Sequence, residues 1–297
     1  MHSLLSMDRM DAVDMEKDIW CPDEVLAACH SAGLPAKGSA SDLWRVLLFE
    51  ETASTNDIAL REAMHGHPAG LVVAAAAQTK GRGRQGRAWI SPRGAGLYVS
   101  VLLRPDFAAS EASRLTAIAA VAAAQAIESQ MPATAPGRGI PVQIKWPNDL
   151  QMRGRKVGGV LIEAGIRGGR LSHAVVGIGI NVSHLQEDFP EELRGRATSL
   201  RLEAQESDPE AAAPRRVDLL AGLMDSLARC LAMPFAEIQA RWTERCHTLG
   251  REVTLRQPDG ATLQGIAVGL GPDGALQFQD QSGSRQSVHA GEVLSEG

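Results

Sequence analysis

Short apolar runs alternate with helix-like stretches through most of the chain. The apolar runs predict strands at residues 44–49, 71–77, 96–103, 142–146, 157–163 and 173–180. Helical patterning follows the capping residues at 52–57 as far as Met64, and is expected again at 111–130, 217–232 and 234–249. Because helices and strands alternate with hairpin-like spacings, the pattern favours an α+β domain over a doubly wound sheet.

The pattern changes on both sides of this region. Residues 1–43 mix acids, Met, Gly and Pro, and only 22–30 suit a short helix, so they are interpreted as an N-terminal extension. Residues 199–216 are polar and rich in Ala and Pro, which predicts a surface connection. After Gly250, alternating stretches separated by Gly-containing turns are typical of β-hairpins in a small barrel. We therefore expect a main domain at 44–249 and a second domain at 250–297.

Composition narrows the possible classes of function. The chain has 297 residues, 44% of them hydrophobic, which is enough to bury a sizeable core. Its 30 Lys and Arg against 35 Asp and Glu give a formal charge of -5, which disfavours binding to nucleic acid or an anionic membrane. The four cysteines form no C-x-x-C pair, and neither a signal peptide nor a membrane helix is recognisable. We expect a soluble protein in the reducing cytoplasm.

A loop rich in glycine and arginine lies between the second and third predicted strands. Residues 81–87 read GRGRQGR and contain the G-x-G-x-x-G of a dinucleotide turn, but Pro92 and the glycines at 94 and 96 leave no room for the helix that such a turn must open. The glycines make the backbone of this loop flexible, and the arginines offer planar, forked hydrogen-bond donors. A loop of this kind could close over a phosphate or a carboxylate. A solvated basic hairpin and a flexible nucleic-acid-binding segment are the alternatives.

Two lysines stand near the ends of predicted strands. Lys145 begins the run KWPND, Lys156 begins KVGGVLIE, and we expect them to flank one hairpin. Each is compatible with an ordinary solvated edge charge, and Asn148-Asp149 with an ordinary turn. Together with the arginine loop, however, they offer cations for a triphosphate and an Asn/Asp pair for Mg²⁺ or ribose.

At this point the sequence resembles a known family. Ser54-Thr55-Asn56, Gln78 with GRGRQGR, SPRGAGLYVS (91–100), KWPNDL (145–150), KVGGVLIE (156–163) and GIGINV (177–182) occur in the order and at spacings similar to those of the biotin protein ligases. The resemblance covers about residues 44–182, and the hairpin-rich tail is similar to that family's C-terminal domain. It implies a mixed β-sheet with packed helices, related to class II aminoacyl-tRNA synthetases, plus a small SH3-like β-barrel.

The resemblance also implies roles for individual residues. It places in the biotin site Ser54, Thr55, Asn56, Gln78, Arg82, Gly83, Arg84 and Lys156. It places near ATP or the adenylate Arg82, Arg84, Trp89, Lys145, Asn148, Asp149 and Asn181. Lys145 and Arg84 are the implied catalytic residues, and Asp149 the implied metal ligand. Simpler roles stay open for some of them, because Ser54 and Thr55 also suit a helix cap and Trp89 a core position.

The activity implied is ATP- and Mg²⁺-dependent activation of biotin, followed by its transfer to a lysine of an acceptor protein. The expected partner is the biotin carboxyl carrier protein of acetyl-CoA carboxylase or a related subunit, and the expected state is a monomer or homodimer. Some members also repress transcription through an N-terminal helix-turn-helix. Here Gly33, Pro35 and Gly38 interrupt the extension and no basic recognition helix is visible, so we expect a monofunctional ligase that binds no nucleic acid.

Two other classes of function are compatible with parts of the sequence. A lipoate or related acyl-protein ligase shares the implied architecture, although the combination of GRGRQGR with KWPND argues for biotin. A non-enzymatic nucleic-acid-binding protein could use the Arg-Gly loop, but the acidic balance and the lack of interleaved aromatic residues count against it.

Overall fold

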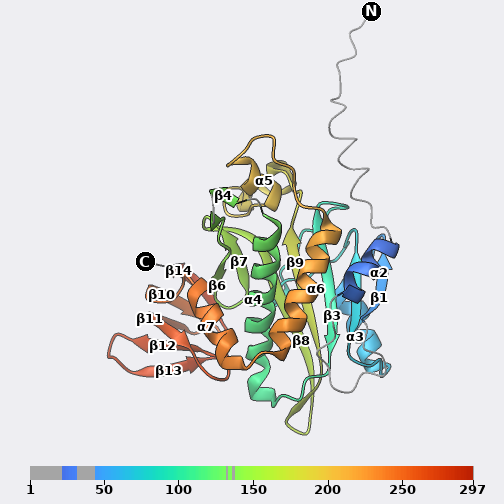
Figure 1. The fold of residues 1–297 in the computed structure, drawn as a ribbon. Helices are drawn as coiled ribbons and strands as arrows, with labels where there is room; N and C mark the ends of the chain where they lie inside the picture. The colour runs from blue at the N-terminus through green and yellow to red at the C-terminus, as the bar shows by residue number, and fades with distance from the viewer. Residues whose placement is uncertain (1–21, 32–43, 132, 136–137, 297) are drawn as a thin grey trace, which may run out of the picture.

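A computed structural model describes residues 22–31, 44–131, 133–135 and 138–296. Figure 1 shows a central sheet with long helices packed across it and a separate group of short strands formed by the C-terminal part of the chain. This mixed sheet with packed helices confirms the predicted α+β fold class. Within the described residues, none of the helices is long and apolar enough to cross a membrane.

The central sheet has seven strands in the order β1-β2-β3-β9-β8-β7-β6. They are β1 (Arg45–Phe49), β2 (Leu71–Ala75), β3 (Gly96–Leu103), β6 (Gln143–Lys145), β7 (Asp149–Met152), β8 (Arg155–Arg167) and β9 (Arg170–Asn181). β1 and β2 run parallel, and the other neighbours are antiparallel. Since parallel neighbours end at the same edge of a sheet, the segments after β1 and β2 lie together, and Thr52 forms a bridge with Gln78.

Helices cover both faces of this sheet. On one face α3 (Thr55–Met64) packs its Ala59 and Ala63 against apolar residues of β2, β3 and β9. On the other face α4 (Ala112–Gln130) and α6 (Arg216–Ala232) lie side by side (Figure 1), and the buried alanines of α4 allow this close packing. β2 and β3 are thus buried on both faces, which explains why their sequences are apolar at almost every position.

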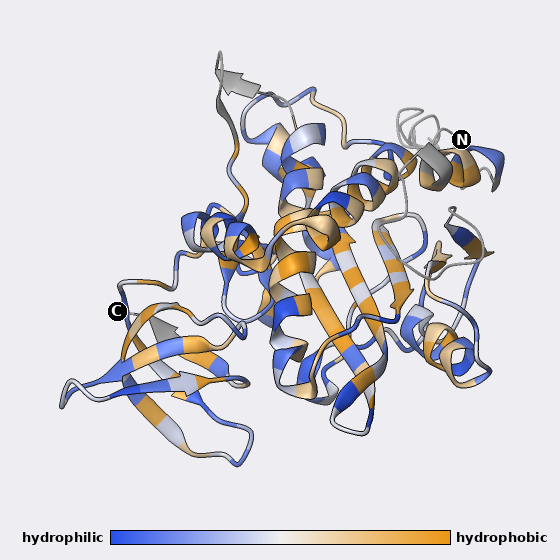
Figure 2. Ribbon diagram, turned by 60° about the horizontal axis from the view of Figure 1, so that its bottom comes forward, coloured by the Kyte–Doolittle hydropathy of each residue, from blue (hydrophilic) through white to orange (hydrophobic). Residues whose placement is uncertain are grey.

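The C-terminal part forms a five-stranded antiparallel sheet in the order β13-β12-β11-β10-β14. Its strands are β10 (Glu252–Arg256), β11 (Thr262–Leu270), β12 (Leu276–Asp280), β13 (Arg285–Val288) and β14 (Glu292–Glu296). Gly260, Gly274 and Gly283 occupy the left-handed region in its turns, as the predicted hairpins require. In Figure 2 the apolar residues are concentrated on the strands and helices that face the central core, and polar residues dominate the outer hairpins.

Shorter elements complete the described chain. They are α2 (Pro22–Ser31), α5 (Leu200–Gln205), α7 (Phe235–Arg245), β4 (Ala133–Ala135), β5 (Arg138–Gly139), η1 (Arg84–Gly86), η2 (Ala109–Glu111), η3 (Gln186–Asp188) and η4 (Glu191–Leu193). Only a single 3-10 turn, η1, forms within the Gly-Arg loop, so the structure contains no dinucleotide-type helix there.

The N-terminal extension contributes to the core, which the sequence did not predict. The short helix expected at 22–30 is present as α2, but it contacts α6 and β1, and its Val25 and Cys29 are fully buried. The rest of the extension lies outside the described residues. The segment 199–216 was also interpreted too simply as a surface connection, because it contains α5, whose Leu200 and Ala204 are buried.

One strand was missed in the sequence, and the end of one helix was predicted too late. The structure places an additional strand, β7, between the two lysine motifs, so Lys145 and Lys156 are separated by two hairpins instead of one. The last long helix ends at Arg245, not at residue 249. Beyond it the chain turns so that the buried Thr248 hydroxyl accepts a hydrogen bond from the Trp146 backbone NH at 3.3 Å.

Candidate active site

A cavity of about 490 Å³ lies against β8 and β9, a size typical of small-molecule sites. Every site residue predicted from the sequence lines it: Ser54, Thr55, Asn56, Gln78, Arg82, Gly83, Arg84, Trp89, Lys145, Asn148, Asp149, Lys156 and Asn181. These residues come from segments spread over more than a hundred positions of the chain. The fold therefore brings the motifs together around one space.

A buried polar cluster forms one wall of the cavity at the start of α3. Ser54 is the N-cap of this helix, but its side chain makes no capping hydrogen bond. The Gln78 side-chain carbonyl accepts hydrogen bonds from the Thr55 NH at 2.9 Å and from the Thr55 hydroxyl at 3.1 Å, and its amide donates to Ser91 Oγ at 3.0 Å. Thr55 is thus more than a helix cap, because it orients Gln78 at the wall.

Glycines of β9 leave room for side chains directly on the sheet. A Cβ atom on Gly177 would lie 2.2 Å from Asn56 Oδ1, and a Cβ atom on Gly179 would lie 2.6 Å from the Trp89 indole. Both separations are far below van der Waals contact. The alternating glycines of the GIGINV motif therefore form a floor on which Asn56 and Trp89 rest.

The arginines of the Gly-Arg loop extend to different parts of the molecule. Arg82 pairs with Glu163 of β8 and with Asp57 of α3, each at 2.7 Å. Arg84 donates to Asn148 Oδ1 at 3.3 Å, and Arg87 pairs with Glu292 of β14 at 2.5 Å. The loop is thus connected to the central sheet and to the C-terminal sheet at once.

These contacts also set the electrostatics of the loop. Burial lowers the pKa of the Arg84 guanidinium, with the Asp149 carboxylate acting in the opposite direction. Because an arginine titrates so far above neutral pH, Arg84 stays charged, and its partial burial strengthens its interactions with nearby anions. The hydrogen bond from Arg87 lowers the pKa of Glu292, so this pair is charged at neutral pH.

Lys156 lines the cavity near the start of β8. Its ammonium is 2.7 Å from Asp149 Oδ1 and 5.4 Å from the centroid of the Trp89 ring, a cation–π distance. Asp149 itself belongs to β7, where it pairs with Lys145 of β6. The added strand therefore places both lysines and the acid within one corner of the sheet.

The segment 194–199 lies beside Lys156 and is fixed from two sides, and its Gly195, Arg196 and Ala197 line the cavity. The backbone of Lys156 donates to the Arg196 carbonyl and accepts from the Thr198 NH, each at 2.8 Å. The side-chain amide of Asn181, at the end of β9, donates to the Thr198 carbonyl at 3.0 Å. Ser199 caps α5 by accepting from the Leu202 NH at 3.2 Å.

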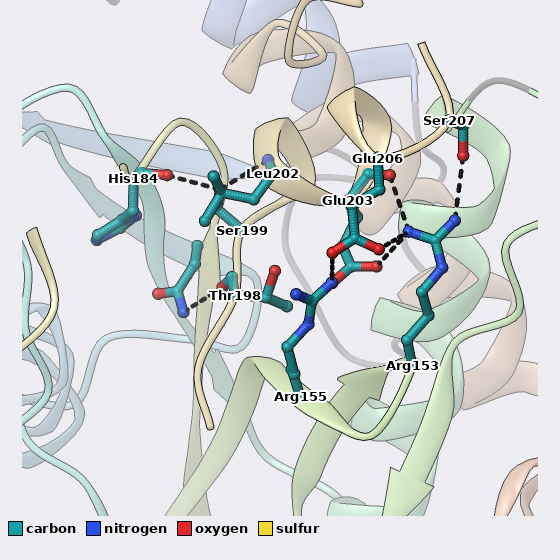
Figure 3. Close-up of polar contacts among 10 residues, drawn as sticks. Arg153, Arg155, His184, Thr198, Ser199, Leu202, Glu203, Glu206 and Ser207 are labelled. Atoms are coloured by element: carbon teal, nitrogen blue, oxygen red, sulfur yellow. Dashed lines mark hydrogen bonds and ion pairs between the residues drawn. The ribbon is translucent and has the colours of Figure 1, made fainter. Parts of the chain in front are cut away.

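Helix α5 is held against the β7–β8 hairpin by charged side chains (Figure 3). Arg155 donates to Glu203 at 2.7 Å and also binds Glu206, while Arg153 contacts Glu203 at 3.3 Å and Glu206 at 2.6 Å. The Glu203 side chain is fully buried, so its negative charge depends on these two guanidinium groups. This network fixes α5 and, through it, the wall beside Lys156.

Several residues of the site were missed by sequence reasoning. Glu163 accepts hydrogen bonds from Asn56 at 2.8 Å and Arg82 at 2.7 Å, and its position within the KVGGVLIE motif was the only available signal. Ser100 lies 2.8 Å from Thr55 Oγ1 beneath the polar cluster, again inside a quoted motif. Glu292 is distant in sequence from every motif, so no local pattern could have revealed it.

The carboxylates near the cavity include Asp149, the expected metal ligand. Within the described ranges, no group of three or more His, Cys, Asp or Glu side chains is arranged to hold a metal ion. Asp149 faces Lys145 across the β6–β7 pairing, and its carboxylate is engaged by Lys156 at 2.7 Å. One carboxylate suits Mg²⁺ only when phosphate oxygens supply further ligands, which is common in nucleotide sites.

Comparison with known proteins agrees with this geometry. Residues 48–181 match the model of the Biotin/lipoate A/B protein ligase family, and residues 248–294 match the Biotin protein ligase C terminal domain. The chain is 33% identical to the biotin--[acetyl-CoA-carboxylase] ligase of Paracoccus denitrificans over 83% of this chain and 99% of the relative. The chain belongs to the biotin protein ligase family. It is accordingly an enzyme of a ligase family.

Other members of the biotin protein ligase family show the same relationship. The bifunctional ligase/repressor BirA of Bacillus subtilis is 34% identical over 80% of this chain and 70% of its own length. The biotin protein ligase of Aquifex aeolicus, solved in complex with biotin and ATP, superposes with a TM-score of 0.66 at 30% identity, covering 84% of this chain and 97% of that one. The family is therefore supported by sequence and by fold.

The close approach of Asn56 to Gly177 of β9 can be tested by adding one methyl group. We expect Gly177→Ala to lower the free energy of unfolding by about 1–3 kcal/mol, because the new Cβ displaces Asn56. Gly222→Ala is the matched control, since its Cβ on α6 meets nothing closer than 3.5 Å and alanine favours a helix. Urea unfolding of both variants measures the difference, and equal stability of the two would contradict the close approach.

The ion pairs of Arg153 and Arg155 predict that Glu203 contributes more to stability than Glu206. We expect Glu203→Gln to cost about 1–3 kcal/mol of unfolding free energy, because two guanidinium groups lose a buried charged partner. Glu206→Gln should cost less, since the Glu206 side chain is 41% exposed and water can replace it. Chemical denaturation checks the order, and a larger effect at Glu206 would show that Glu203 is not the central partner.

Proposed function

We propose that this chain is an ATP-dependent biotin protein ligase that forms biotinyl-5'-AMP and then transfers biotin to a lysine of a carrier protein. The observation that carries the proposal is one cavity in which a buried polar cluster around Thr55 and Gln78 adjoins the cations Arg84, Lys145 and Lys156. Such a cavity suits a ligand that is neutral and polar at one end and anionic at the other. Biotin joined to a phosphate has this character.

Biotin is assigned to the part of the cavity lined by Ser54, Thr55, Asn56 and Gln78, with the loop residues Arg82 and Gly83 at its edge. Polar groups buried beside Gly177 would pair with the ureido ring, and they would reject analogues that lack these hydrogen bonds. These polar groups support biotin over lipoate as the substrate, because lipoate has no ureido group. The match to the C-terminal domain model of biotin protein ligases supports the same choice.

ATP and the adenylate are assigned to the part lined by Trp89, Asn148, Asp149 and Asn181. An amide does not form readily from a free carboxylate, so the acid is first joined to the α-phosphate and pyrophosphate departs. Carboxylate and triphosphate repel each other, and Lys145 and Arg84 would offset this repulsion while aligning the attacking oxygen with phosphorus. We assign Lys156 to biotin, together with Arg84, and its ammonium lies 5.4 Å from the centroid of the Trp89 ring.

Mg²⁺ is proposed to accompany ATP, and it would neutralise part of the triphosphate charge when bound. We assign Asp149 as the protein ligand of Mg²⁺. Oxygen atoms of the ATP phosphates would supply further ligands. Asp149 also orients Lys156 through the ion pair at 2.7 Å, so the acid has a role with or without the ion.

The acceptor is proposed to be a biotin carboxyl carrier protein. Relatives from Paracoccus denitrificans and Mycobacterium tuberculosis are named biotin--[acetyl-CoA-carboxylase] ligases, which supports a carboxylase subunit as the partner. We assign catalysis to residues 44–249 and the small C-terminal unit to residues 250–297. A monofunctional ligase without DNA binding stays a prediction, because it concerns residues 1–43, most of which lie outside the described residues.

The proposal is tested by replacing the assigned cations. We expect Lys145→Ala and Arg84→Ala to slow biotin-dependent ATP–pyrophosphate exchange by about 10²–10³-fold, because each removes a preorganised positive charge from the transition state. Arg61→Ala is the control, since this arginine is exposed on α3 and does not line the cavity. Labelled biotin, ATP, Mg²⁺ and a carrier domain supply the assay, and absence of exchange and transfer by the parent protein would overturn the ligase assignment.

The Gly-Arg loop is expected to become more protected when ligand binds. Residues 81–94 would close over the adenylate and keep water from the mixed anhydride, which requires that the loop open again for substrate exchange. Hydrogen exchange of this segment should therefore be slower with biotin and ATP than without them. Equally slow exchange in both states would contradict a closing loop while leaving the ligase assignment untouched.

A further inference from the structure

A chain of hydrogen-bonded side chains links the two ends of the Gly-Arg loop, residues 81–94, behind the cavity wall. It begins where the loop ends, at Ser91, whose hydroxyl donates to the Trp89 carbonyl and accepts from the Gln78 side-chain amide, each at 3.0 Å. The Gln78 carbonyl accepts from the Thr55 NH at 2.9 Å. Because a backbone NH can only donate, this contact fixes the orientation of the Gln78 amide.

Ser100 of β3 continues this chain from Thr55 to Asn56. Its side chain is fully buried, and its hydroxyl lies 2.8 Å from Thr55 Oγ1 and also within hydrogen-bond distance of Asn56 Oδ1. A hydroxyl has a single proton, so Ser100 cannot donate fully to both oxygens at once. A change in the hydrogen bonds of Thr55 is therefore felt at Asn56.

Glu163 of β8 closes the chain at the start of the loop. Its Oε2 accepts from Asn56 Nδ2 at 2.8 Å and from Arg82 Nη2 at 2.7 Å. Since a carboxylate only accepts, this contact turns the Asn56 amide with its nitrogen toward Glu163 and its oxygen toward Ser100. Both ends of the loop are thus attached to one buried polar cluster.

The members of this chain lie either at the surface of the cavity or behind it. Those that line the cavity are Thr55, Asn56, Gln78 and Arg82. Those that lie behind these lining residues are Ser91, Ser100 and Glu163. A residue behind the wall acts on a ligand through the side chains that it holds.

Asp57 of α3 shows that charge alone does not account for the position of Glu163. Asp57 Oδ1 lies 2.7 Å from Arg82 Nη2, the same distance as Glu163 Oε2. The Asp57 side chain is half exposed, and among the described residues no hydrogen bond joins it to the polar cluster. Each acid compensates the charge of Arg82, but of the two acids Glu163 alone also holds Asn56.

We propose that Glu163 is a positioning residue that couples ligand binding at the polar wall to closure of the Gly-Arg loop. This inference rests on the ligase function proposed above. A ligand held by Thr55 and Asn56 keeps the Asn56 amide turned toward Glu163, and Glu163 then holds Arg82 and the start of the loop. Biotin at the wall and nucleotide beneath the loop therefore strengthen each other's binding, by the same factor in both directions.

The experiment measures this coupling by calorimetry on the full chain. Biotin affinity is determined without nucleotide and with a saturating ATP analogue that carries a methylene group between the α- and β-phosphates, so that no adenylate forms. The ratio of the two affinities is the coupling factor. Glu163→Ala removes both contacts, and Glu163→Gln keeps an acceptor oxygen. Asp57→Ala is the matched control, because it removes a carboxylate from the same guanidinium.

We expect a coupling factor of at least about 5 in the parent protein and in Asp57→Ala, a value near one in Glu163→Ala, and an intermediate value in Glu163→Gln. Glu163→Gln carries the test if Glu163→Ala does not fold.

Three results would overturn the proposal. An equal fall in Asp57→Ala would assign the effect to the charge beside Arg82. A loss of biotin affinity in the Glu163 variants that is the same with and without the analogue would assign Glu163 to the shape of the pocket. A parent protein without coupling would leave Glu163 nothing to transmit. Absence of biotin binding by the parent is a separate result, which overturns the ligase assignment itself.

Discussion

The site depends on the absence of side chains along one stretch of β9. Gly177 and Gly179 let Asn56 and Trp89 lie against the backbone of a buried strand, at separations that any Cβ atom would forbid. Asn56 then reaches Glu163 on β8, and Trp89 reaches the ammonium of Lys156. A buried strand normally favours large apolar residues, and here the glycines leave that space to Asn56 and Trp89.

Charge around the cavity is arranged in compensated pairs. Arg82 is neutralised by two carboxylates, Arg87 by Glu292, and Lys156 by Asp149. Among the residues that the structure describes, Arg84 hydrogen-bonds to the neutral amide of Asn148, and the acids Asp149 and Glu292 act on its pKa from further away. The positive field offered to an anion therefore comes mainly from a few groups, while the protein as a whole keeps its formal charge of -5.

Much of the fold and of the site could be predicted from the sequence because the motifs are local. β3 was predicted with its observed bounds, and the residues chosen from the motifs all line one cavity. β7 was missed because Asp149–Met152 is short, begins with an acid and follows a turn sequence. α5 was missed because its charged face carries Glu203, and a buried carboxylate becomes understandable only when Arg153 and Arg155 are placed beside it in space.

The ion pair between Arg87 and Glu292 joins residues 205 positions apart in the chain. One belongs to the loop over the cavity and the other to the last strand of the molecule, next to Gly291 and Val293, which also line the cavity. The C-terminal sheet is thus part of the enclosure and not an appendage to it. A shortened chain ending before β10 would keep every motif quoted from residues 44–182 and would lack the part of the cavity wall that Gly291, Glu292 and Val293 form.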